Sequence, residues 1–131
     1  MNTKLIMTLS ALALVLIGIT LTFLPREIAG YLGGGNSKSF EIVLQILGAL
    51  YFGFAMLDWM AKGSIIGGIY NRPISIANFT HFLIGALALV KAMTNGSGLP
   101  EFLWILAGLY ALFALLFALI LFGHPTPNKK R

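Results

Sequence analysis

The chain contains no cysteine, and this absence excludes several kinds of redox and metal site. A thiol–disulfide oxidoreductase needs a pair of thiols, and thiolate-bound zinc and iron–sulfur clusters need cysteine ligands. Two histidines and four acidic residues, without an HExxH motif, also give poor support to a zinc hydrolase. No serine lies in a GxSxG motif. We therefore predict no metal site, no cofactor and no catalytic residue.

Charged residues are also scarce. They make up 10% of the 131 residues, against about a quarter in a typical soluble domain, while 58% of the residues are hydrophobic. A water-soluble domain of this size with so few ionic groups would expose large apolar patches. The composition therefore indicates a membrane protein surrounded by a lipid bilayer. The excess of nine basic over four acidic residues then reflects orientation in the membrane rather than binding of nucleic acid.

Four long apolar runs account for most of the chain. Each approaches the length of about 20 residues that crosses a bilayer, and turn-forming residues separate them. The expected helices cover residues 5–24, 40–61, 74–94 and 99–122. Short connections favour antiparallel neighbours, so we predict an all-α membrane protein, with four transmembrane helices in an up-down bundle and a single domain over residues 1–131.

The first run differs from a cleaved signal peptide. Its apolar part is longer than the roughly 7–15 residues of a signal-peptide core, and its only preceding basic residue is Lys4. We expect a retained helix; cleavage would leave three spans.

Lysine and arginine are distributed unevenly between the two ends of the predicted bundle. One end carries six of these residues and the other carries three, and the more basic end is expected to face the cytoplasm. We therefore predict that both termini are cytoplasmic, in a multi-pass protein of the cell inner membrane. The six are Lys4, Lys62, Arg72, Lys129, Lys130 and Arg131; the three are Arg26, Lys38 and Lys91.

Polar residues inside the spans are concentrated on the second and third helices. If these two helices form a hairpin, Asp58 lies level with Asn78, and His81 follows Asn78 on the same helix face. One interpretation is a pocket open to the cytoplasm, in which Asp58, Lys62, Asn78 and His81 bind a small polar ligand or a lipid head group, or relay protons. The other is structural: Asp58 pairs with Lys62 or Arg72, and the two polar residues of the third helix fix helix packing.

Two further polar groupings follow from the same counting. Glu41 lies level with the end of the third helix, which predicts an ion pair with Lys91 on the outer side. Lys62 and Arg72 form a basic inner loop that is suited to anionic lipid head groups.

Small residues recur along the fourth helix. Such a stripe lets helix backbones approach closely in lipid, and it would serve either the bundle interior or contact with a second subunit or another membrane protein. Its members are Ala107, Ala111, Ala114 and Ala118.

Three local sequences carry a family resemblance. They are Phe23-Leu24-Pro25 before a glycine-rich loop, Ile46-Leu47-Gly48-Ala49-Leu50 followed by Gly53, and the basic inner loop. With these the chain resembles the small four-helix inner-membrane proteins of bacteria near the DoxX-like group. The resemblance implies four helices and an accessory role beside other membrane proteins. The leading hypothesis is therefore a non-enzymatic structural or accessory protein, and the alternative is a carrier for a small molecule or lipid.

Overall fold

The structure is a computed structural model that describes residues 2–64, 66, 68–96 and 98–123. Its regular structure in those residues is entirely helical, and four of the helices are long and apolar enough to cross a membrane. The helical fold predicted from the sequence is confirmed. The elements are α1 (Thr3–Phe23), α2 (Pro25–Tyr31), α3 (Lys38–Ala61), the short 3₁₀ helix η1 (Ile69–Asn71), α4 (Arg72–Thr94) and α5 (Phe102–Phe122).

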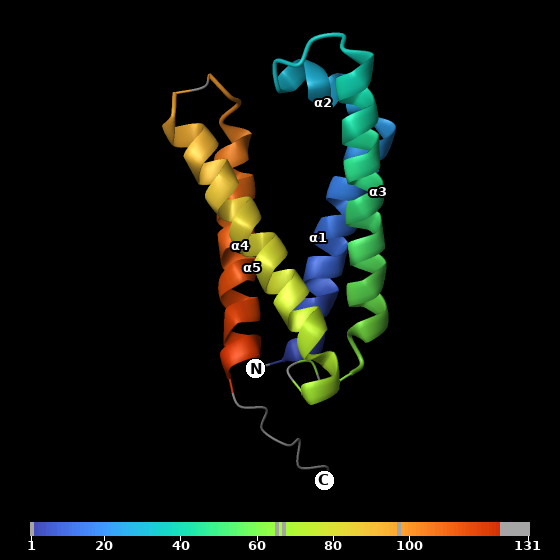
Figure 1. Ribbon diagram of the computed structural model, residues 1–131, viewed down its shortest axis with the longest axis vertical. Coiled ribbons are helices and arrows are strands. Elements are labelled where there is room, and N and C mark those ends of the chain that lie inside the picture. The colour runs from blue at the N-terminus through green and yellow to red at the C-terminus, as the bar shows by residue number, and fades with distance from the viewer. Residues whose placement is uncertain (1, 65, 67, 97, 124–131) are drawn as a thin grey trace.

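The long helices form two antiparallel pairs. Helix α1 packs along α3, and α4 packs along α5. The pairs lie close together at the end where α1 begins and α3 ends, and they diverge toward α2 and the α4–α5 connection (Figure 1). We call the first end the closed end and the second the open end. Short helix α2 lies across the open end of the α1–α3 pair (Figure 1).

Local signals explain where the helices begin. The side chains of Asn2 and Ser37 accept hydrogen bonds from backbone N–H groups three residues on, which caps α1 and α3. A proline occupies the first turn of both α2 and α4, where its missing N–H costs nothing. Between α2 and α3 the backbone turns through Gly35 at φ 58°, a conformation that favours glycine.

The α1–α3 pair is held at close distance by two glycines. A Cβ atom added to Gly48 would lie 2.8 Å from the carbonyl oxygen of Gly18 and 2.9 Å from the backbone nitrogen of Thr22. A Cβ on Gly18 would in turn lie 3.0 Å from the carbonyl oxygen of Gly48. In lipid, where apolar surface alone does not drive helices together, such close backbone packing stabilises the pair.

The α4–α5 pair is held by aromatic packing. The Phe82 ring lies 5.3 Å from the ring of Tyr110, 4.9 Å from that of Phe113 and 5.8 Å from that of Phe117, measured between centroids. These rings belong to a buried cluster that also includes Ile6, Met7 and Leu14 of α1. The cluster therefore joins the two pairs toward the closed end.

The alanine stripe of α5 is divided by burial. Ala107 and Ala114 are buried within the chain and Ala118 is half-buried, whereas Ala111 is exposed. The first interpretation of the stripe, packing inside the bundle, fits its two buried members; contact with a second subunit or another membrane protein stays a prediction.

Candidate functional site

A buried carboxyl group joins three helices near the closed end. The Asp58 side chain on α3 accepts a hydrogen bond from the Ser10 hydroxyl on α1 and another from the Asn78 side-chain amide on α4. The Asn78 Nδ2 to Asp58 Oδ1 distance is 2.6 Å. All three residues are 0% exposed. The predicted alignment of Asp58 with Asn78 is thus found in the structure, and Ser10 is an additional partner.

The three residues meet because of where they lie along their helices. At 1.5 Å per residue, Asp58 is about 5 Å from the end of α3, Asn78 is about 9 Å from the start of α4, and Ser10 is about 10 Å from the start of α1. These helix ends are adjacent at the closed end (Figure 1). The carboxyl group therefore lies inside the membrane-spanning part of the protein.

Asp58 has no basic partner among the described residues. The Lys62 ammonium lies instead over the Trp59 ring, 2.9 Å from its centroid. Arg72 is exposed at the first residue of α4. The expected ion pair of Asp58 with Lys62 or Arg72 does not form, because the carboxyl group points toward neutral donors on α1 and α4.

The predicted site residue His81 lies one turn beyond Asn78 on α4. Its ring is surrounded by aromatic rings from three helices, at centroid distances of 5.1–5.5 Å. Its Nε2 atom is buried and has no hydrogen-bond partner in the described part of the protein. The four surrounding residues are Tyr51, Phe54, Phe82 and Tyr110.

Two tyrosines extend the polar groups further into the membrane. The hydroxyls of Tyr51 on α3 and Tyr110 on α5 form a hydrogen bond across the two helix pairs. The Tyr110 ring lies directly against Gly85, where an added Cβ would overlap it. The smallest side chain at Gly85 therefore makes room for the tyrosine pair.

Helix α4 presents a row of polar atoms along this region. Ser75 Oγ, Asn78 Oδ1 and His81 Nε2 are all buried without a hydrogen-bond partner among the described residues. Successive members are three residues apart, so they share one side of the helix. Buried polar atoms are normally paired, so these three atoms call for partners beyond the described residues, such as water molecules or a polar solute.

The polar residues around Asp58 suit one small cation better than a metal ion that needs several protein ligands. The described residues contain no cluster of three or more His, Cys, Asp or Glu side chains that would hold a metal ion. One carboxyl group with neutral hydrogen-bond donors and no base provides a single negative charge in a medium of low dielectric constant. Such a charge is costly unless a cation or a proton accompanies it.

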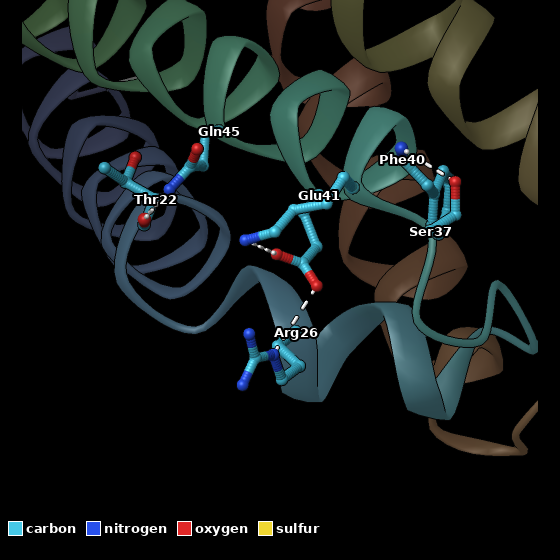
Figure 2. A network of polar contacts seen from close by, with 7 residues as sticks. Thr22, Arg26, Ser37, Phe40, Glu41 and Gln45 are labelled. Carbon is cyan, nitrogen blue, oxygen red and sulfur yellow. Dashed lines mark hydrogen bonds and ion pairs between the residues drawn. The ribbon is translucent and has the colours of Figure 1, made fainter.

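A second polar network lies at the open end (Figure 2). Glu41 lies 3.5 Å from Arg26 and 3.8 Å from Lys38, and the Gln45 side chain donates a hydrogen bond to the Thr22 carbonyl at 3.5 Å. No ion pair between Glu41 and Lys91 is present among the described residues. The predicted pair does not form because α3 and α4 diverge toward this end (Figure 1), whereas α2 brings Arg26 next to Glu41 of α3 (Figure 2).

The Glu41 network should add little to stability. Arg26 and Lys38 are 68% and 80% exposed at their side chains, and ion pairs with exposed members contribute about 0–1 kcal/mol. We expect Glu41→Gln to lower the free energy of unfolding in SDS titrations by less than about 1 kcal/mol. A loss of twice that size would show that the network holds α2 in place.

Comparisons of the chain with family models, with curated proteins and with solved structures gave no match. The resemblance to the DoxX-like group therefore stays a prediction.

Proposed function

We propose that the protein is a membrane carrier that binds a small cation at Asp58. One observation carries this proposal: the Asp58 carboxyl is fully buried in a spanning helix, and its described partners, Ser10 and Asn78, are neutral. Ionisable groups inside membranes are expensive and usually mark ion or substrate pathways. A group needed only for packing would be cheaper as an apolar side chain of similar volume.

The proposal also includes the direction of the bundle. The closed end, near which Asp58 lies, would face the cytoplasm, in a protein of a bacterial inner membrane. This is supported by the sequence, which assigns six lysines and arginines to that end and three to the other. Of the six, Lys129, Lys130 and Arg131 lie outside the described residues. The cation would then reach Asp58 from the cytoplasmic side.

The second candidate is an accessory protein that acts through helix contacts alone. The observation that favours it is the satisfied hydrogen bonding of the carboxyl oxygens, which ties α1, α3 and α4 together. In this case Asp58 would matter for packing, and no solute would cross the membrane.

Uptake into vesicles separates the two candidates. The protein is reconstituted and an inside-negative potential is imposed with potassium and valinomycin. Uptake of protons, of sodium ions and of methylammonium is then measured in separate arms. We expect uptake of at least one cation to fall about tenfold or more in Asp58→Asn, because the neutral amide lacks the negative charge that attracts the cation, and a loss of about 1.4 kcal/mol in binding is a tenfold change.

The substitution keeps the size of the side chain but replaces one of its two acceptor oxygens with an NH2 donor, so the hydrogen bond to Ser10 or to Asn78 must rearrange. Circular dichroism and the SDS titration check that the variant still folds. Glu41→Gln is the matched control, since it removes the other carboxyl group of the spanning helices, and it should leave uptake unchanged. If the wild-type protein transports none of the three cations, or if Asp58→Asn transports them equally well, the carrier proposal is wrong.

A further inference from the structure

A second feature lies between α1 and α3, separate from the Asp58 site. It is an apolar groove of about 200 Å³. Ala11 and Ala55 are buried in it, whereas Leu12, Met56 and Trp59 are exposed along it. The groove therefore opens toward the surroundings of the bundle. Its lining residues are Ala11, Leu12, Val15, Ala55, Met56 and Trp59.

Two lysines lie beyond the groove, one in α1 and one directly after the end of α3. Lys62 follows Trp59 by three residues, and its ammonium rests on the Trp59 ring. Lys4 precedes Ala11 by seven residues, two turns along the same face of α1. Both lysines lie at the closed end, where α1 begins and α3 ends. The groove is thus apolar along its length and flanked by positive charge at one end.

We propose that this groove binds an anionic phospholipid, with an acyl chain along the apolar lining and the phosphate next to Lys62 and Lys4. The apolar lining offers an acyl chain close packing, and it requires no polar group to be buried. The Lys62 ammonium rests on the Trp59 ring, and lysine side chains near the ends of membrane helices extend along apolar surface to the head-group level, where tryptophan also concentrates. Basic residues beside helices at this depth attract anionic lipids.

Charge favours a lipid over a second copy of the chain in this groove. A copy inserted in the same orientation would bring its own lysines to the same depth as Lys4 and Lys62, and the like charges would repel. A phosphate group instead neutralises them and accepts their hydrogen bonds.

Quenching of Trp59 fluorescence tests the proposal. The reporter protein carries Trp104→Phe, so that Trp59 is its sole tryptophan. It is placed in phosphatidylcholine vesicles with a minor fraction of phosphatidylglycerol. Bromine atoms are carried either by the phosphatidylglycerol or by an equal fraction of the phosphatidylcholine. We expect an anionic lipid to be enriched next to Trp59 about fivefold for each lysine that contacts it, and hence stronger quenching by the brominated phosphatidylglycerol.

Three variants define the site. Lys62→Gln should lower the enrichment of the anionic lipid about fivefold. Arg72→Gln, which removes the same charge at the same end but on α4, should retain it. Val15→Phe, which fills the groove and keeps both lysines, should lose it.

Equal quenching by the two brominated lipids would overturn the proposal. Retention of the preference in Val15→Phe would do so as well, because it would indicate general attraction of anionic lipid by the basic end. If both lipids fail to quench Trp59, another protein surface covers the groove and the proposal is also wrong.

Discussion

Gly48→Ala is expected to lower the free energy of unfolding by about 3 kcal/mol, the upper part of the range for overpacked interiors. The added methyl group would lie 2.8 Å from the Gly18 carbonyl oxygen and 2.9 Å from the Thr22 nitrogen. Both are backbone atoms, so no side-chain rotation relieves the overlap. The two helices must move apart, and the close packing that stabilises α1 against α3 is lost along the pair. SDS titration followed by circular dichroism measures the change.

Gly53→Ala is the matched control for this prediction. Gly53 lies on the same helix, but an added Cβ meets nothing within 4 Å. This substitution should be neutral or slightly stabilising, since alanine favours the helix by up to about 1 kcal/mol over glycine. Equal losses for the two variants would show that helix propensity, rather than contact between α1 and α3, explains the effect of Gly48→Ala.

Phe82→Ala is expected to cost about 2–3 kcal/mol of unfolding free energy. Removing a buried phenylalanine from a soluble core costs about 3–5 kcal/mol, of which part is transfer to water. The unfolded helices of this protein remain in lipid, so the transfer part largely disappears and the cavity part is retained. Phe82 is 1% exposed and contacts three rings of α5, so its cavity would be enclosed.

The control for Phe82→Ala is Phe52→Ala. Phe52 is 46% exposed and faces the surroundings of the bundle, so its loss should change the free energy of unfolding by less than about 1 kcal/mol. The same SDS titration measures both. A similar cost for the two variants would contradict the view that the aromatic cluster stabilises the α4–α5 pair.

The sequence alone predicts the spanning helices well, because length and hydropathy decide them. The predicted range 40–61 corresponds to α3 at Lys38–Ala61, and 74–94 to α4 at Arg72–Thr94. Helix α2 was not predicted. Its seven residues are too few for a periodic pattern, and only Pro25 indicates where it begins.

Counting residues outward from the α3–α4 loop predicts which residues of the two helices lie side by side. The prediction is correct near the loop and wrong far from it. It aligns Asp58 with Asn78, which are hydrogen-bonded. The same count places Glu41 beside Lys91, but Glu41 pairs with Arg26 and Lys38. The count assumes that the two helix axes stay parallel, and their divergence increases with distance from the loop (Figure 1).

Several partners in the candidate site were missed for chemical reasons. A serine in an apolar helix, such as Ser10, commonly bonds to its own backbone, and its hydroxyl does make such a contact with the Met7 carbonyl. Tyr51 and Tyr110 count as aromatic packing residues until a structure shows their hydroxyls meeting. A polar atom on a nearly apolar helix is the signal that would have indicated Ser10 and Tyr110.

The division into two helix pairs has a consequence for biogenesis. Synthesis delivers α1 and α3 first, so Asp58 enters the bilayer with Ser10 available and before Asn78 follows it. Membrane helices insert before they associate, and the second pair then supplies the amide donor and the Tyr110 hydroxyl. Docking of the α4–α5 pair therefore supplies the second hydrogen-bond donor to Asp58, whose carboxyl group the α1–α3 pair has already brought into the bilayer.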